Sequence, residues 1–222
     1  PTGGVLSKSD LKGIARVIRE QAPPDVRVFS DEVYEHILFD GERNYSIASP
    51  PSKADGIELC ILTRRGGRAA RYLTEELARG DVLRVQGPYG HFHLPDPLDH
   101  DPVFATESVG ISAIRSILLD LFERGTARRV DLLFSATHEN ELLYRRELEA
   151  LPGLTPTWIL AHPPEGWAGG TGTLAAAVRE RLAAEPGRKV WVSGFEWTVN
   201  PVADVLAELG VPADRIEIER YD

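Results

Sequence analysis

The chain has 222 residues, 42% of them hydrophobic and 27% charged, which is typical of a globular protein long enough for two domains. Its net charge of −9 and the lack of a basic stripe argue against a nucleic-acid partner. No run is long and apolar enough to span a bilayer and no signal peptide is visible, so we expect a cytoplasmic protein without a membrane partner. Because the chain begins at Pro1 and contains no Met, we also expect residues to precede it.

The first part of the chain has the pattern of a small β-barrel. A short amphipathic helix comes first, with Leu11, Ile14 and Val17 on one face. Short strand-like segments separated by turn residues follow, which predicts an antiparallel barrel domain over residues 1–96. The expected strands are Val33–Phe39, Asn44–Ala48, Ile57–Leu62 and Asp81–Gln86, with one helix at Arg71–Arg79 that ends at Gly80.

After the proline- and acid-rich stretch Pro95–Pro102, which is typical of a linker, strand and helix patterns alternate. This alternation predicts an α/β domain over residues 102–222, with a parallel sheet covered by helices on both faces. The expected strands are Pro102–Thr106, Val130–Ala136, Pro156–Ala161, Lys189–Ser193 and Arg215–Glu219. The expected helices are Ile111–Arg124, Glu139–Leu151, Leu174–Ala184 and Val199–Leu209. The predicted fold class is therefore a two-domain β + α/β architecture. Ligands of such sheets bind beyond the carboxyl ends of the strands.

The segment Arg43–Pro51 has the side chains that point most clearly to a ligand. Arg43 can pair with a phosphate in a forked geometry, and Tyr45 can stack on a flat ring. The hydroxyl of Ser46, next in the strand, can bind a ring nitrogen. Taken alone, the segment also fits an ordinary edge strand.

Several motifs together resemble the ferredoxin–NADP reductase superfamily, in the same order along the chain. Arg-x-Tyr-Ser-x-Ala-Ser at 43–49 resembles the flavin motif of that family, and Gly66–Leu73 resembles the helix entrance at the flavin phosphate. Gly80–Phe92 resembles the "G-D-x-L…G-P-x-G-x-F" strand and turn, and Trp167–Gly172 a glycine-rich loop before a helix. The terminal Ile216–Tyr221 resembles the closing segment whose acid and aromatic residue lie near the flavin ring.

The resemblance implies a flavin, FAD with FMN as the alternative, held by the barrel, with NAD(P)H docking on the α/β domain. Hydride would pass from the nicotinamide to the flavin, and electrons would leave to a separate acceptor protein or a small-molecule acceptor. The implied flavin-binding residues are Arg43, Tyr45, Ser46, Gly66, Gly67, Ala69, Ala70 and Tyr221, and the implied nicotinamide-side residues are Gly110 and Gly194. The residues predicted to be catalytic are Ser46, Ser193 and Glu219.

The nicotinamide side departs from the family pattern. Where the family has A-G-G-T-G-I-A-P, this chain has Glu107 and Ser108 in place of two glycines. The family's C-G-P-P loop is Ser193–Glu196 here, which adds a second carboxylate, Glu196. The arginines of the G-x-R and S-R motifs are replaced by Thr137 and His162. Added carboxylates and lost arginines disfavour an anionic dinucleotide, so the use of NAD(P)H is left open.

Three functions therefore stay open. The first is a flavin-dependent oxidoreductase that passes electrons between NAD(P)H, flavin and a separate acceptor. The second is a flavoprotein that has lost NAD(P)H binding and acts as a biosynthetic enzyme on another ligand, and the third is a non-catalytic subunit. Cys60, the single cysteine, is expected to be structural, and no metal site is predicted because His91 and His93 have no third ligand nearby. Trp197 could wall a pocket at the altered loop, although packing is the simpler interpretation.

Overall fold

The computed structural model describes residues 36–39, 43–63, 68–83, 85–95, 97–185 and 187–221. The helix predicted around Leu11 lies outside these residues. All the elements described below belong to one compact unit, Val33–Asp222. None of its described helices is long and apolar enough to cross a membrane.

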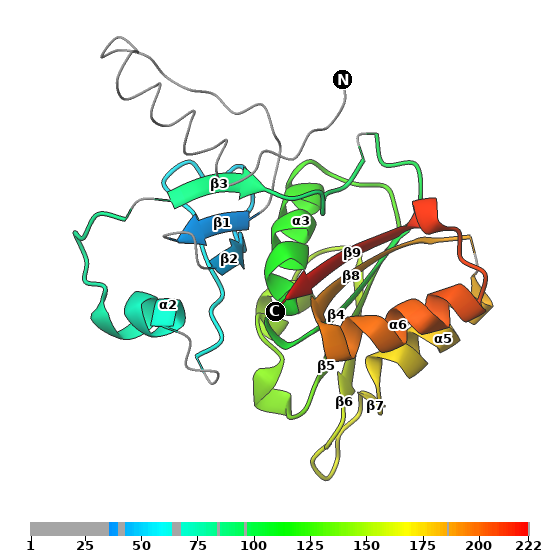
Figure 1. Cartoon of the computed structure of the whole chain (residues 1–222). Helices are drawn as coiled ribbons and strands as arrows, with labels where there is room; N and C mark the ends of the chain where they lie inside the picture. Colours follow the sequence, from blue (N-terminus) through cyan, green and yellow to red (C-terminus); the bar gives the residue numbers. More distant parts are fainter. Residues whose placement is uncertain are drawn as a thin grey trace. The chain divides into compact units, whose positions relative to one another are not determined.

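The first half of this unit contains a three-stranded antiparallel sheet in the order β2-β1-β3 (Figure 1). Its strands are β1 (His36–Phe39), β2 (Arg43–Ser46) and β3 (Val85–Tyr89). A short helix, α2 (Arg68–Arg71), continues into a π-helical turn at Tyr72–Glu76. The helical segment thus begins and ends about three residues earlier than predicted. Its early end is explained by the turn between Ala78 and Asp81 that follows it.

The strand predicted at Ile57–Leu62 is reduced to one bridge between Leu59 and Ile47. Ala48 still donates its backbone N–H to Glu58 (2.8 Å). The carbonyl of Ala48, however, accepts from the Arg115 side chain instead of continuing a ladder. The antiparallel pairing therefore ends at Ala48, because the Ala48 carbonyl is bonded to a side chain of the second half of the unit.

The second half is a six-stranded parallel sheet in the order β7-β6-β5-β4-β8-β9. Its strands are β4 (Pro102–Glu107), β5 (Val130–Ala136), β6 (Leu154–Leu160), β7 (Gly170–Thr171), β8 (Lys189–Phe195) and β9 (Ile216–Tyr221). Its helices are α3 (Ile111–Glu123), α4 (Arg145–Glu149), α5 (Leu174–Ala184) and α6 (Glu196–Glu208).

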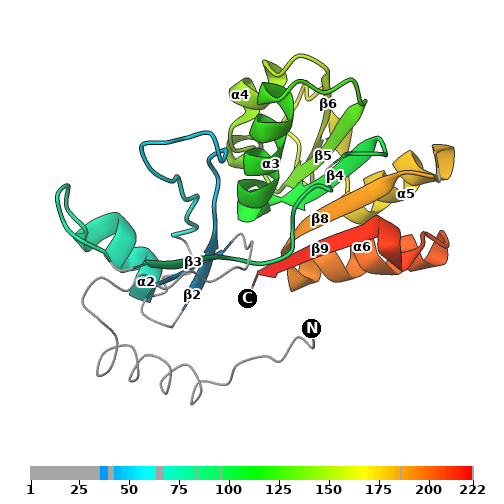
Figure 2. The same ribbon diagram turned by 90° about the horizontal axis from the view of Figure 1, so that it is seen from above.

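Helices cover both faces of this sheet, as predicted (Figure 2). Successive residues of a strand point to opposite faces, so Phe104 of β4 packs with α3 while its neighbours Val103 and Ala105 pack with α5 and α6. Each face buries its own apolar cluster, and this double burial explains the continuous apolar runs of the strands.

The helix predicted at Glu139–Leu151 is divided into a 3-10 turn, Glu139–Glu141, and the short α4. The break lies at Tyr144, whose backbone is left-handed (φ 57°). Its ring lies under the Arg115 guanidinium, 4.4 Å from the ring centroid, so a tertiary contact interrupts the local helical pattern.

A buried ion cluster ties the amino ends of three strands together. The carboxylate of Asp131 in β5, 3% exposed, accepts from Arg188 and from Arg181 (2.6 Å). Arg188, 5% exposed, also donates to the carbonyls of Asp101 (3.0 Å) and Pro102 (2.9 Å). Arg188 precedes β8, so this one guanidinium connects β4, β5 and β8.

Asp131→Asn should lower the free energy of unfolding by about 3 kcal/mol, because the buried Arg188 guanidinium then keeps only the more exposed carboxylate of Glu185, at 3.4 Å, as a counter-charge. Urea denaturation of both proteins measures the difference. The matched control is Glu208→Gln, whose exposed pair with Arg179 should contribute below about 1 kcal/mol. An equal loss in both variants would contradict a special role for the buried cluster.

Candidate functional site

Three of the predicted site residues meet where β2 faces β9. The Ser46 hydroxyl donates to Glu219 Oε1 and lies 3.0 Å from the Tyr221 hydroxyl. Ser46 and Glu219 are 6% and 4% exposed. We call these three residues the Ser46 cluster. It joins the two halves of the unit through side chains more than 170 positions apart in the sequence.

Burial raises the pKa of Tyr221 well above its ordinary value, and the negative charge of Glu219 raises it further. The phenol of Tyr221 is therefore neutral at physiological pH and can act as a hydrogen-bond donor toward the carboxylate.

Arg115 of α3 holds the two halves of the unit together next to this cluster. Its guanidinium is paired in a forked geometry with both carboxylate oxygens of Glu147, at 2.7 and 2.8 Å. The same group donates to the carbonyl of Ala48 (2.5 Å) and to Glu58 (2.8 Å). Arg115 is 8% exposed, so these bonds compensate the burial of its charge. We call this set of contacts the Arg115 clamp.

The clamp also affects its neighbours. The Arg115 guanidinium lowers the pKa of Glu58, and the carboxylates of Glu147 and Glu58 raise that of Arg115. Ser116, next along α3, donates to the carbonyl of Ser49 (2.7 Å). Residues 46–49, which form the end of β2 and the segment just after it, are thus held against α3 on one side and β9 on the other.

The predicted nicotinamide-side residues lie at the carboxyl ends of the neighbouring parallel strands β4 and β8. Ser193 is fully buried, and its hydroxyl donates to the carbonyl of Gly110 (2.8 Å). Thr106 in turn donates to the Ser193 carbonyl (3.0 Å). A Cβ on Gly110 would lie 2.5 Å from Thr106 Oγ1 and 2.6 Å from the Ser193 carbonyl oxygen, so only glycine fits. The Ser193 hydroxyl therefore fixes the loop after β4.

The two residues that replace family glycines lie next in this loop. Ser108 has a left-handed backbone (φ 55°), the conformation that glycine adopts without strain. The Glu107 carboxylate accepts from the Thr198 hydroxyl (2.7 Å) at the start of α6. Gly194 is buried at the end of β8, with φ 152°, and a Cβ there would contact Thr198 Cβ at 3.7 Å. The loop therefore has a glycine-like backbone conformation at Ser108 and carries a carboxylate at Glu107, where the family motif has glycines.

A pocket of about 210 Å³ opens at this carboxyl edge of the sheet. Trp197 lies on its wall, with 52% of its surface exposed, and its ring also stacks on Phe195. Its lining residues are Glu107, Ser135, Ala136, Thr137, Ala161, Gly172, Thr173, Leu174, Ala175, Trp197, Thr198 and Pro201. None of these described residues is a lysine or an arginine.

The other predicted flavin-side residues lie on the barrel half. Arg43 and Tyr45 belong to β2, in register with Phe39 and Ile37 of β1. Ala69 and Ala70 belong to α2. Gly66 and Gly67 lie outside the described residues.

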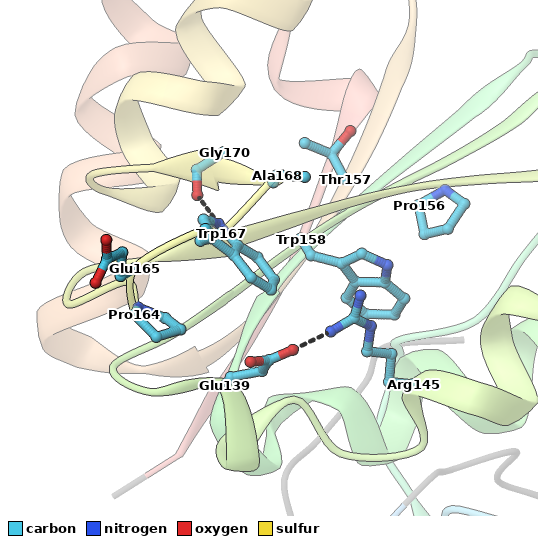
Figure 3. A pocket seen from close by; sticks show the side chains of 12 residues that line it. Glu139, Arg145, Pro156, Thr157, Trp158, Pro164, Glu165, Trp167, Ala168 and Gly170 are labelled. Atoms are coloured by element: carbon cyan, nitrogen blue, oxygen red, sulfur yellow. Dashed lines mark hydrogen bonds and ion pairs between the residues drawn. The ribbon is translucent and has the colours of Figure 1, made fainter.

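Figure 3 shows a separate cavity of about 610 Å³ beside β6 and the glycine-rich loop before α5. The Trp167 indole N–H donates to the carbonyl of Gly170 (2.9 Å), and Arg145 pairs with Glu139 (2.8 Å). The Arg145 guanidinium lies 5.7 and 5.3 Å from the ring centroids of Trp158 and Trp167. These side chains bind one another, and their contacts hold the loop that leads into α5.

Comparison with known proteins identifies the family. The chain matches the oxidoreductase FAD-binding domain over residues 33–94 and the oxidoreductase NAD-binding domain over residues 108–200. It is 32% identical over 193 residues to ferredoxin–NADP reductase B of Sorangium cellulosum, covering 82% of this chain and 78% of that protein. The chain belongs to the ferredoxin–NADP reductase superfamily.

Two further relatives are longer than this chain. Phenol hydroxylase P5 protein of Acinetobacter pittii is 30% identical over 228 residues, covering 98% of this chain but 64% of that protein. The phenol 2-monooxygenase reductase component DmpP of Pseudomonas sp. is 32% identical, covering 82% of this chain and 54% of that protein. The chain thus spans between about half and two thirds of the length of these two relatives.

Solved structures of the superfamily agree on the fold. The Amycolatopsis cytochrome P450 reductase GcoB superposes with a TM-score of 0.73 at 24% identity, over 88% of this chain and 62% of that one. The predicted family and the two-domain β + α/β fold class are therefore confirmed, and the matched FAD-binding domain agrees with the predicted cofactor. The domain boundaries stay a prediction.

Sequence reasoning missed Arg115 and Thr198. A signal for Arg115 was present, because it is the one charged residue between Ile114 and Leu118 on the apolar face of a predicted helix. A charged side chain in such a place needs a partner, but the sequence does not show that Glu147 and Ala48 supply it. Thr198 gives no such signal, since it is an ordinary residue in a first helical turn.

Arg115→Ala should lower the free energy of unfolding by about 3 kcal/mol, because Glu147 and the Ala48 carbonyl lose their partner. It should also speed amide exchange in residues 46–58, measured by hydrogen–deuterium exchange. Arg179→Ala, which removes an exposed ion pair, is the control and should change neither quantity appreciably. Unchanged exchange in residues 46–58 would contradict the clamp.

Because the pKa of Tyr221 is raised in the folded protein, the fold becomes less stable at alkaline pH. Unfolded Tyr221 releases its proton near its ordinary pKa while folded Tyr221 keeps it, so stability is lost as the pH rises beyond that value. Between about pH 9 and 11, the free energy of unfolding of the wild type should therefore decrease relative to that of Tyr221→Phe. Urea denaturation at each pH measures it, and a constant difference would contradict the assignment.

Proposed function

We propose that this chain is the flavin-dependent reductase part of an electron-transfer system, taking electrons from a nicotinamide dinucleotide and passing them through FAD to a separate acceptor. The Ser46 cluster is the observation that supports this most directly, because it joins the FAD-binding half to the carboxyl edge of the NAD-binding half. A separate acceptor protein is suggested by relatives named as reductase components of oxygenase systems. A cytoplasmic location is part of this proposal.

On the flavin side, we assign Arg43 to the phosphate, Tyr45 to stacking on the ring and Ser46 to the ring edge. Gly66, Gly67, Ala69 and Ala70 would supply backbone groups to the phosphate, and Tyr221 would close the site. FAD supplies the chemistry that takes up an electron pair and releases electrons to an acceptor. FMN stays the alternative cofactor.

The residues of the Ser46 cluster fit this group because they place polar atoms in a buried position beside β2. The Ser46 Oγ–H donates to Glu219 Oε1, which fixes the direction of the Ser46 hydroxyl. The neutral Tyr221 hydroxyl lies within hydrogen-bond distance of Ser46 and keeps the pair oriented. Glu219 is therefore proposed as the residue that orients Ser46, with Ser46 as the contact toward the flavin.

On the nicotinamide side, Gly110 and Gly194 are kept as the proposed contacts of a dinucleotide, although both are buried and Gly110 packs against Thr106 and Ser193. Ser193 was predicted to be catalytic, but its buried hydroxyl and its bond to the Gly110 carbonyl favour a positioning role. The Glu107 carboxylate also supports a second candidate, a flavoprotein that has given this pocket to another ligand or acts as a non-catalytic subunit.

An anaerobic titration of the flavin-loaded protein with NADH and then NADPH tests the proposal. Bleaching of the flavin absorption by either nucleotide, followed by reoxidation on adding an artificial acceptor, is the expected result. A yellow protein that neither nucleotide bleaches would favour the second candidate.

Arg43→Ala should reduce flavin retention at least about tenfold, because a charged partner of the phosphate is removed. The flavin-to-protein absorbance ratio after gel filtration measures retention. Arg79→Ala on the same half of the unit is the control, and full retention in Arg43→Ala would contradict the flavin site.

A further inference from the structure

The backbone donors at the ends of β5 and β6 are already bonded within the chain. Directly after β5, the N–H groups of Thr137 and His138 both donate to the Glu141 carboxylate, at 3.2 and 3.3 Å. Directly after β6, the N–H groups of Ala161 and His162 donate to two carbonyls at and just after the end of β5, each at 3.0 Å. We call these four donors the strand-end amides. Backbone N–H groups gathered in this way often bind an anion, but here their partners come from the chain itself.

The local structure holds the Glu141 carboxylate in this place. Glu141 is the last residue of the 3-10 turn Glu139–Glu141, and its own N–H donates to the carbonyl of His138 (3.0 Å). A single oxygen, Oε2, accepts from both amides after β5. Thr137 lines the pocket of about 210 Å³ at the carboxyl edge. The carboxylate is therefore one hydrogen bond away from a residue of the pocket wall.

The neighbouring guanidinium does not offset this negative charge. Arg145 pairs with Glu139 and Glu149, at 2.8 Å in each case. Figure 3 shows its guanidinium directed at Glu139 and at the rings of Trp158 and Trp167, within the separate cavity beside β6. Since no lysine or arginine is among the described residues that line the pocket at the carboxyl edge, an added phosphate there would meet a fixed carboxylate and bonded amides.

The two nicotinamide dinucleotides differ only at the 2′ position of the adenosine ribose. NADH has a free hydroxyl there, which can donate to a carboxylate, whereas the 2′-phosphate of NADPH has acceptor oxygens and about two negative charges. In α/β sheets, an acid beyond a strand end suits the free hydroxyl and an arginine suits the phosphate. In this chain Thr137 and His162 replace the arginines of the family motifs, and Glu141 supplies the acid.

We propose that Glu141 makes this chain selective for NADH over NADPH. Its carboxylate occupies two of the strand-end amides and places a negative charge where a 2′-phosphate would have to bind. Glu141 is then a specificity-determining residue of the reductase as well as a part of the turn after β5. This inference rests on the proposed function, because it assumes that a nicotinamide dinucleotide binds along the carboxyl edge of the sheet.

The test measures dissociation constants of NAD⁺ and NADP⁺ for the oxidised holoenzyme by calorimetry, where neither ligand can reduce the flavin. The wild type should bind NAD⁺ at least about tenfold more tightly than NADP⁺. Glu141→Gln keeps one oxygen that can accept from both amides and removes only the charge. It should tighten NADP⁺ binding about tenfold and change NAD⁺ binding less than about twofold.

Two further variants complete the test. Glu139→Gln removes the same charge two positions earlier, from a half-exposed side chain that pairs with Arg145, and should change the ratio of the two constants less than about twofold. His162→Arg leaves the bonds of Glu141 in place and adds a cation after β6, so it should tighten NADP⁺ binding about tenfold by itself.

Equal binding of the two nucleotides to the wild type would overturn this inference. So would an unchanged ratio in Glu141→Gln, whether His162→Arg tightens NADP⁺ binding or not. In these cases, bleaching of the wild-type flavin by NADH or NADPH would leave the proposed function intact. If neither nucleotide bleaches the flavin, the proposed function fails and this inference fails with it.

Discussion

The organisation of this chain depends on one buried guanidinium. Arg115 is placed on the apolar face of α3, where a charge is costly unless it is paired, and its partners come from both halves of the unit. Satisfying it requires the segment after β2 to lie against α3. Ser49 is then held by Ser116, and Ser46 lies within reach of Glu219. The clamp therefore sets the register between the FAD-binding half and the end of the parallel sheet.

The carboxyl edge of the parallel sheet has two separate regions. β9 faces the flavin strand through the Ser46 cluster, while the ends of β4, β5 and β6 open into the small pocket. Between these two regions, Ser193 at the end of β8 packs against Gly110 after β4 and leaves no space for a side chain at position 110.

Much of this fold follows from sequence pattern, and the exceptions have physical causes. The bounds of β5 and α5 agree with the prediction residue for residue, because continuous apolar runs and helical spacing are local signals. The predicted strand Ile57–Leu62 is reduced to one bridge and the predicted helix Glu139–Leu151 is interrupted at Tyr144, because Arg115 contacts Ala48 and Tyr144. The motifs named Ser46, Glu219 and Tyr221, which do meet, whereas the partners of Arg115 and Glu107 depend on distant residues that no local pattern shows.

The central claim is that the Arg115 clamp aligns the flavin strand with the nucleotide-binding edge. Stopped-flow reduction of the flavin-loaded protein by NADH, compared between wild type and Arg115→Lys, tests it most directly. Lysine keeps the charge but loses the forked geometry, so we predict bound flavin with an unchanged visible spectrum and reduction slowed about 100-fold. An equal reduction rate in the two proteins, with flavin fully bound in both, would contradict the account.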